Sequence, residues 1–286
     1  MLWLLVGACA PATQYRRGAL VPTPRGDSLV HTQRRQVELS GAVAFTDVDQ
    51  DPLPSYGDPA LQAARTTFLG QARLRVGKYL RLGAQGFFSH ASFAAPTAAG
   101  TPPMNGQRVW GLGPQLSFHF RDARWAFGGG FSLTLASVPW TAWQRRDGAP
   151  ELVNEPVDTV IERYEEVRRG REVHPLVTIG VGATWIAHPA FEAFVGLTLQ
   201  SSLTNIGFDD QERHGSTLQS DNVGMAPFVG ITARAPGAGV YVRAQYDYPL
   251  AFEQFTWGGA RSWGGVMASV GVELGPNPDA PLGLGL

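Results

Sequence analysis

The sequence predicts an all-β protein, a closed antiparallel transmembrane β-barrel of about ten strands. Three observations lead to this prediction. Apolar and polar residues alternate with a period of two over long segments, which is the pattern of strands with one apolar face. The connections between these segments are alternately long and short, and aromatic residues gather near both ends of the segments.

The clearest single element is a hairpin over residues 66–89. Its first arm, Phe68–Val76, alternates apolar and polar residues, and its second arm, Tyr79–Ser89, repeats the pattern after Gly77 and Lys78. Two alternating segments joined by a short turn that contains glycine predict a β-hairpin.

The same reading of the whole chain predicts ten strands. They are expected at Gln36–Asp47, Phe68–Val76, Tyr79–Ser89, Arg108–Phe120, Trp125–Val138, His174–Ala187, Phe191–Leu203, Val223–Arg234, Gly239–Tyr248 and Trp263–Leu274. Long and short connections alternate without exception, as in barrels with short periplasmic turns and long extracellular loops. An even number of strands would place both termini on the periplasmic side.

Tryptophan and tyrosine near both ends of the strands give independent support, because membrane interfaces select these residues. The expected girdle residues are Trp110, Trp125, Trp185, Tyr246, Tyr248 and Trp263. Strict alternation along the last strand would turn Trp263 inward. The alternative is that these are core aromatics of a soluble sandwich.

Composition excludes several classes of function. The 286 residues carry a formal net charge of -1 and only 16% charged residues, which leaves no electrostatic footprint for nucleic acid. No apolar run approaches the roughly 20 residues of a membrane helix. Nucleophile-elbow, phosphate-loop and zinc-ligand spacings are missing from the sequence, so neither a catalytic residue nor a cofactor is predicted.

The N-terminal segment predicts export. Cys9, the single cysteine, closes an apolar run that looks like a lipoprotein signal. The alternatives are a signal cleaved by another route and a start site placed too late, since no Lys or Arg precedes the run. The expected organisation is a signal-like segment at 1–9, a flexible periplasmic lead-in at 10–35, a barrel at 36–274 and a disordered periplasmic tail at 275–286.

Over residues 36–274 the chain resembles small bacterial outer-membrane β-barrel proteins of the porin-like and OmpA-type kind. The likeness is one of pattern, without a diagnostic motif. It implies residence in the Gram-negative outer membrane, contact with its lipids and insertion by the barrel-assembly machinery. Such chains usually end on an aromatic residue of the last strand, whereas this one runs on to Leu286.

Three loops carry further candidates. Asp47, Asp49 and Asp51 have the alternate spacing of calcium ligands, although Pro52 stands where such a loop needs glycine, and a solvated acidic loop is the alternative. The loop with Asp209, Asp210, Glu212 and His214 raises the question of an omptin-like protease at the rim. Its spacing does not match that family, so loop polarity is the competing explanation.

The longest loop, Pro139–Val173, has apolar residues at helical spacing between Val157 and Val167. They predict either a short amphipathic helix over the barrel mouth or a hairpin that extends the fifth and sixth strands. The sequence leaves both readings open.

If the apolar faces point to lipid, the polar residues between them line the lumen. The expected lining residues are Glu38, Gln71, Arg73, Arg75, Arg81, Gln85, His119, Glu192, Arg243, Asp247 and Glu273. Charged residues gather on the first three and last two strands and should form ion pairs. Strands four to eight contribute mainly glycine, serine and threonine.

This uneven wall indicates a narrow porin or small-solute channel with an off-centre polar passage. Alternatively, the glycine side could pack against an inserted segment, either the third-loop helix or the lead-in. A non-conducting structural or surface-interaction barrel is the second function, and a rim enzyme, either a protease or a lipid hydrolase, is the third.

Overall fold

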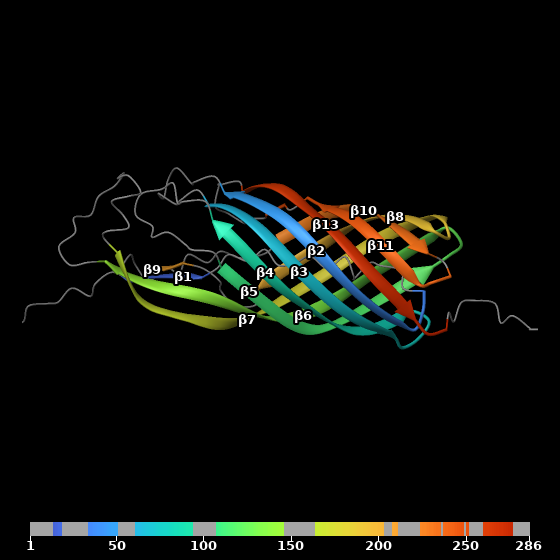
Figure 1. Cartoon of the computed structure of the whole chain (residues 1–286), viewed down its shortest axis with the longest axis horizontal. Coiled ribbons are helices and arrows are strands. Elements are labelled where there is room, and N and C mark those ends of the chain that lie inside the picture. The colour runs from blue at the N-terminus through green and yellow to red at the C-terminus, as the bar shows by residue number, and fades with distance from the viewer. Residues whose placement is uncertain are drawn as a thin grey trace, which may run out of the picture.

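The computed structural model describes residues 14–18, 34–50, 61–93, 107–145, 164–202, 208–210, 224–235, 237–248, 250–251 and 260–276. Ten strands in this part of the chain form the wall of a barrel (Figure 1). They are β2 (Val37–Gln50), β3 (Leu61–Arg75), β4 (Leu80–Phe93), β5 (Gln107–Arg121), β6 (Trp125–Arg145), β7 (Tyr164–His188), β8 (Phe191–Ser202), β10 (Gly224–Ala235), β11 (Val240–Asp247) and β13 (Ala260–Leu274).

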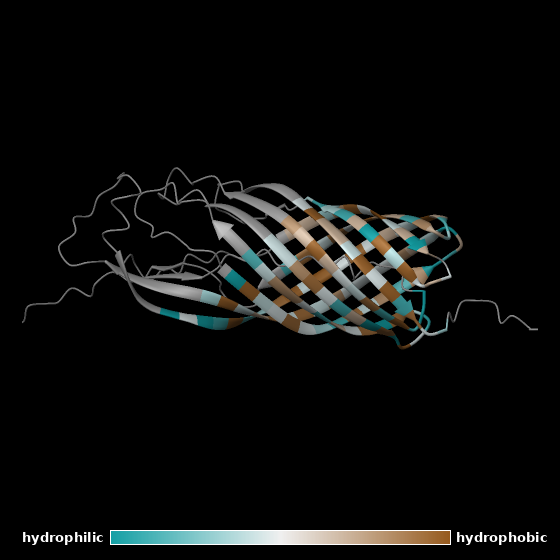
Figure 2. Ribbon diagram, in the orientation of Figure 1, coloured by the Kyte–Doolittle hydropathy of each residue, from teal (hydrophilic) through white to brown (hydrophobic). Residues whose placement is uncertain are grey.

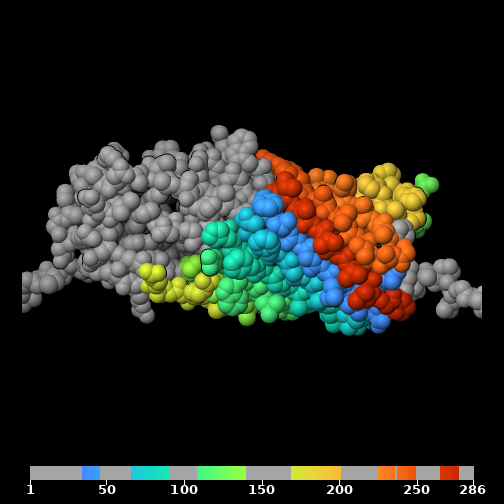
Figure 3. Space-filling view, viewed as in Figure 1, coloured from blue at the N-terminus to red at the C-terminus, as the bar shows by residue number. Residues whose placement is uncertain are grey.

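Each barrel strand pairs antiparallel with the barrel strand that follows it in the chain, and pairing of β13 with β2 closes the ring. The closing register runs from Leu274 opposite Val37 to Ala260 opposite Gln50. In Figure 3, β13 in red lies between β2 in blue and β11 in orange. The predicted closed antiparallel barrel is therefore confirmed.

The barrel has two distinct ends. The ends of β2 and β13 that carry Val37 and Leu274 lie beside the short connections, and we call this side the turn end. The opposite side, where the long connections leave the strands, is the loop end. The structure describes no helix long and apolar enough to span a membrane.

Strands β6 and β7 are much longer than the sequence predicts. Their pairing continues from Trp125 opposite Trp185 to Arg145 opposite Tyr164, so the hairpin projects beyond the other strands at the loop end (Figure 1). The hairpin interpretation of the third loop is correct for residues 164–167. Residues 157–163, where the helix was expected, lie outside the described residues.

In the described part of the chain, three short strands lie outside the ring. Strand β1 (Gln14–Gly18) pairs with Trp140–Gln144 of β6 and also with β9 (Phe208–Asp210), and β12 (Leu250–Ala251) pairs with β10. Because β6 starts at the turn end, its residues 140–144 lie at the loop end. Strand β1 therefore lies at the end of the barrel opposite Arg34 and Val37.

Apolar side chains on alternate residues point away from the barrel. Leu112 keeps 62% of its surface exposed, Leu135 51% and Val195 56%, although all three lie in the middle of paired strands. Figure 2 shows the resulting alternation of hydrophobic and hydrophilic residues along the strands. An outward wall of this kind is what lipid contact requires, since exposed apolar patches of this extent are rare on soluble monomers.

Aromatic residues occupy both edges of the outward wall. The exposed fraction is 48% for Trp125 and 47% for Trp185 at the turn end, and 52% for Trp110 nearer the loop end. Tyr246 and Tyr248 are exposed as well. At the last expected girdle residue, Trp263, β13 has a register shift between Ser262 and Gly264. A bulge interrupts strict alternation, so the expectation that alternation turns Trp263 inward loses its basis.

Candidate functional site

The candidate site is the barrel lumen, which the inward-facing residues of every wall strand share. All residues expected to line it are buried or half-buried, and they lie on the face opposite the exposed apolar residues. They are Glu38, Gln71, Arg73, Arg75, Arg81, Gln85, His119, Glu192, Arg243, Asp247 and Glu273. Strand alternation places them there, because residues on the other parity carry the apolar wall.

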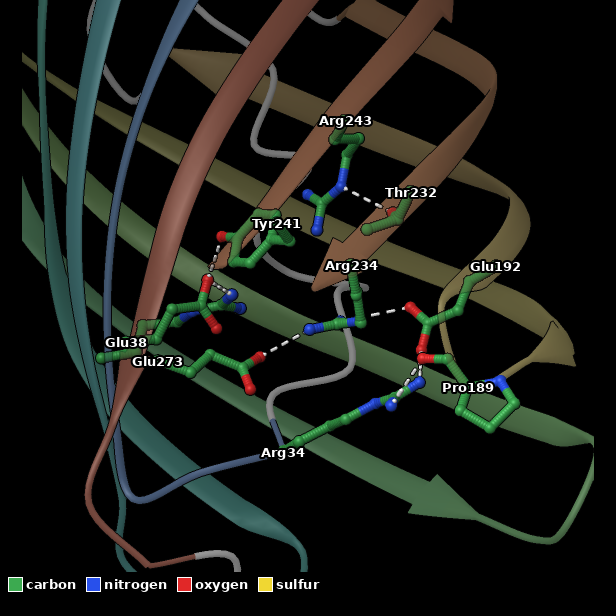
Figure 4. Close-up of polar contacts among 10 residues, drawn as sticks. Arg34, Glu38, Pro189, Glu192, Thr232, Arg234, Tyr241, Arg243 and Glu273 are labelled. Atoms are coloured by element: carbon green, nitrogen blue, oxygen red, sulfur yellow. Dashed lines mark hydrogen bonds and ion pairs between the residues drawn. The ribbon is translucent and has the colours of Figure 1, made fainter. Parts of the chain in front are cut away.

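A chain of ion pairs crosses the lumen near the turn end (Figure 4). Arg234 on β10 donates hydrogen bonds to Glu273 on β13 over 2.9 Å and to Glu192 on β8 over 3.2 Å. Arg34, just before β2, binds the other oxygen of Glu192 over 2.7 Å and donates to the carbonyl of Pro189 over 2.9 Å. Two arginines and two glutamates therefore form a neutral chain.

A second polar group surrounds Glu38 on β2. Its carboxylate pairs with Arg73 on the neighbouring strand and accepts a hydrogen bond of 2.6 Å from the Tyr241 hydroxyl. The guanidinium of Arg234 lies 5.2 Å from the centre of the Tyr241 ring. Tyr241 thus links the two groups of ion pairs. The predicted pairing of arginines and carboxylates is found on β2, β3 and β13, and it extends onto β8 and β10.

Arg243 stands one inward position above Tyr241 on β11. Its Nε donates to the Thr232 hydroxyl over 3.3 Å. Its guanidinium carbon lies 5.3 Å from the Phe194 ring centre and 5.4 Å from that of Tyr241. Stacking on two aromatic rings holds the cation in the lumen and favours a charged side chain there.

His119 faces this cation from the other wall. It lies on β5, which is five strands from β11 in either direction around the ring, so the two residues are on opposite sides. His119 is only 3% exposed and lies one inward position from Ser117, which is the register partner of Arg81. Within the described structure, neither of its ring nitrogens has a hydrogen-bond partner.

Further arginines on the inward face donate hydrogen bonds to backbone carbonyl oxygens near the turn end. Arg75 donates to those of Gly77 and Lys78, both over 3.1 Å, and Arg81 donates to that of Tyr79 over 3.2 Å.

Glycines on the inward face are covered by neighbouring side chains. The Phe194 ring on β8 lies over Gly230 of β10, and the Phe228 ring on β10 lies over Gly196 of β8, with 6.1 Å between the ring centres. Each position has space for an aromatic ring because its partner lacks a side chain. The expected glycine-rich part of the lumen wall is present, but phenylalanine rings fill it at β8 and β10.

On β4, at the other edge of the glycine-rich wall, Gln85 reaches across a glycine of β5 to β6. Its amide nitrogen donates to Ser132 over 2.9 Å and to Thr134 over 3.0 Å. Gly113 of β5 lies between, opposite Gln85 in the register. A Cβ atom at Gly113 would come 1.8 Å from the Leu133 carbonyl oxygen, so only glycine fits this close approach.

An apolar cluster occupies the lumen toward the loop end. Its buried members come from six strands and form one packed cluster, with Ala42 and Ala44 of β2 packed against them. They are Leu69, Phe87, Val109, Ala136, Val138, Leu176 and Met267, each at most 9% exposed. The lumen is therefore layered, with an apolar layer above a charged one.

Three polar residues of the site were missed in the sequence analysis. Arg234 shares the parity of Gly230, and Tyr241 shares that of Arg243, so the alternation pattern contained the signal for both. Arg34 precedes the first strand and has no periodic pattern around it. Inward phenylalanines such as Phe87 were missed because the next residue, Phe88, satisfied the outward pattern.

The remaining expected sites are only partly described. Asp47 and Asp49 lie in β2, and Asp51 lies outside the described residues. Among the residues that the structure describes, no group of three or more potential metal ligands is found. Asp209 and Asp210 belong to β9, whereas Glu212 and His214 lie outside the described residues. Cys9 and residues 277–286 are also outside them.

No protein-family model matches the chain, and neither does any curated protein. Solved structures similar to it include an outer-membrane channel from Pseudomonas putida F1, with 10% identity, a TM-score of 0.48 and coverage of 87% of this chain and 99% of that one. The translocator domain of the autotransporter NalP from Neisseria meningitidis gives 11% identity, a TM-score of 0.44 and coverage of 87% and 91%. For Neisserial surface protein A the values are 12%, 0.35, 83% and 97%.

Proposed function

We propose that this protein is an integral barrel of the bacterial outer membrane that conducts small polar solutes as a narrow channel. One observation carries the proposal, the unequal bulk of the lumen wall. Arginine, glutamate and tyrosine side chains fill the lumen beside β2, β3, β11 and β13, whereas the inward residues of β5–β7 include many of glycine, serine and threonine. Ten strands also enclose more space than the eight that side chains just fill.

The membrane assignment rests on the outward wall. Its exposed leucines, valines and aromatics need an apolar environment, and a closed ring leaves no strand edge unpaired within it. Outer-membrane lipids would surround this wall. Insertion by the barrel-assembly machinery follows from the same assignment.

A specific observation favours a second function, a barrel that does not conduct. The apolar cluster around Leu69 and Leu176 lies within the lumen, and Arg34 bridges to Glu192 at the turn end. A structural or surface-interaction role would suit a lumen closed in this way.

Single-channel recording separates the two functions. The refolded protein should give a small, steady conductance in a planar bilayer, and Arg75→Glu should change its ion selectivity. If the wild type is silent, variants that lack residues 19–33 or 157–163 should conduct. Silence of all three proteins would overturn the channel and leave the structural role.

A further inference from the structure

We propose that Arg108 and Arg171 form a binding site for a phosphorylated lipid headgroup on the outer surface of the barrel at its loop end. The inference rests on the membrane assignment of the proposed function and is independent of conduction. It adds a specific partner to the general lipid contact of the apolar wall, namely an anionic lipid whose headgroup carries phosphate.

The two arginines lie one outward position beyond the edge of the apolar wall. Trp110 on β5 pairs with Ser137 on β6, which in turn pairs with Val173 on β7, so these residues form one outward row. Trp110 is 52% exposed and Val173 64%. Arg108 and Arg171 are the next outward positions toward the loop end, and both are exposed. Aromatic residues mark the membrane interface, so lipid headgroups would lie at the level of these arginines.

The Arg171 side chain crosses the outer surface of β6 and reaches β5. Its Nε donates to the Ser137 hydroxyl over 2.9 Å, and its Nη2 donates to the carbonyl oxygens of Ser137 over 3.0 Å and of Arg108 over 2.9 Å. Ser137 is only 7% exposed although it shares the row of Trp110 and Val173, as expected where a side chain lies over it. These bonds hold the guanidinium beside Arg108.

The bound guanidinium keeps both charge and donors for a ligand. Among the described residues, its acceptors are all neutral oxygens, and they use the N–H groups of Nε and Nη2. The N–H groups of Nη1 are left for a further acceptor. Guanidinium donors match phosphate oxygens, and a side chain that is already ordered loses less entropy on binding.

Neighbouring residues do not cancel this charge on the outer surface. His90 on β4 pairs with Arg108 in the register, and the remaining described position of the row is Pro139 on β6. The carboxylate of Glu172, which follows Arg171 in the chain, lies 3.6 Å from Nε2 of the inward residue His174. The described part of the row is therefore basic, which favours an anionic headgroup.

The test uses the full chain refolded in detergent and native mass spectrometry of its lipid complexes. Phosphatidic acid is the probe, and diacylglycerol with the same acyl chains is its control, because the two lipids differ only in the phosphate group. We expect saturable binding of phosphatidic acid and at least about tenfold weaker binding of diacylglycerol, which is the effect of one hydrogen bond to a charged group. Equal binding of the two lipids would overturn the site.

Matched variants make the result specific. Arg108→Gln should weaken the binding of phosphatidic acid about fivefold, as expected for one arginine at a membrane surface. This substitution retains the backbone carbonyl that Arg171 binds, and Arg171→Gln should have a similar effect. Arg124→Gln, at an exposed position in the turn before β6, should leave binding within about twofold, because the charge that it removes is distant. Equal weakening by Arg108→Gln and Arg124→Gln would overturn the site, and heat-modifiable gel mobility establishes that each variant has folded.

The membrane assignment and the site can fail separately. A chain that is monomeric in solution without detergent would overturn the membrane assignment and the site with it. A chain that needs detergent but binds both lipids equally would overturn the site alone. Inorganic phosphate at the concentration of the lipid should leave phosphatidic acid bound. Displacement of the lipid by inorganic phosphate would show that the site takes the free ion, and it would overturn the lipid as the occupant.

Discussion

Arg34 forms an ion pair of 2.7 Å with Glu192, although β2, which follows Arg34, and β8, which carries Glu192, are four strands apart in a ring of ten. The contact therefore spans the lumen. Glu192 also binds Arg234, so one carboxylate ties the start of the barrel to two distant strands. We therefore expect Glu192 to contribute more to the stability of the barrel than a residue that contacts only neighbouring strands.

Glu192→Gln tests that role. The substitution keeps the shape of the side chain but leaves two arginines facing a neutral amide, and breaking a buried pair costs about 3–5 kcal/mol. We expect a lower midpoint in a urea refolding titration and a lower temperature of heat modification. Asp122→Asn, in an exposed turn, is the control and should change neither. Equal stability of Glu192→Gln and the wild type would show that the ion-pair chain contributes little.

The outward wall gives a second prediction. Leu82 is 46% exposed on the outward face of β4 and pairs with Leu116, which lies four residues farther from the turn end than Phe120. Leu82→Arg should destabilise the folded barrel by about 2–4 kcal/mol in lipid vesicles, whereas Phe120→Arg at the turn end should cost about 0–1 kcal/mol. If the two substitutions cost the same, the position of the membrane on the barrel is wrong.

A third prediction concerns the close approach of β5 and β6. Gly113→Ala would push a methyl group against the Leu133 carbonyl, and overpacking of this kind costs roughly 1–3 kcal/mol. Gly70→Ala is the matched control, because a Cβ atom there meets nothing within 4 Å. Gly113→Ala should therefore give a lower refolding yield and a lower urea midpoint than Gly70→Ala. The prediction fails if Gly70→Ala is the more damaging change.

The sequence could predict the properties that are determined within a single strand or turn. Alternation with a period of two assigns each residue to a face without any knowledge of pairing, so the inward positions of Glu38, Arg73 and Glu273 were predictable. The closed ring followed from strand number and from the alternation of long and short connections. Both properties are set by backbone geometry within single strands and turns.

Contacts between distant strands could not be predicted in the same way. The bridge from Arg34 to Glu192 depends on side-chain reach across the lumen and on the order of strands in the closed ring. The long pairing of β6 and β7 was ambiguous because apolar residues in that loop also fitted a helical period. Bulges such as the one at Ser262 and Gly264 shift the register by one residue and leave only a weak sequence signal.

The last prediction concerns the apolar layer of the lumen. Met267 on β13 and Leu176 on β7 belong to one buried cluster, although their strands are four apart in the ring. The cluster lines the passage continuously from β13 through β2 and its neighbours to β7, and hydrophobic constrictions oppose conduction by excluding water. Met267→Ala should therefore raise the single-channel conductance of the refolded protein, even though truncation of a buried methionine costs about 2–5 kcal/mol of stability.

Val266→Ala is the matched control for this change. Val266 precedes Met267 on β13 and is 56% exposed on the outward face, so its truncation leaves the lumen unaltered. Its conductance should equal that of the wild type in the same planar bilayer. If Met267→Ala conducts no better than Val266→Ala, the apolar cluster does not limit the passage. The limiting constriction would then lie in the charged layer, where Arg34 meets Glu192.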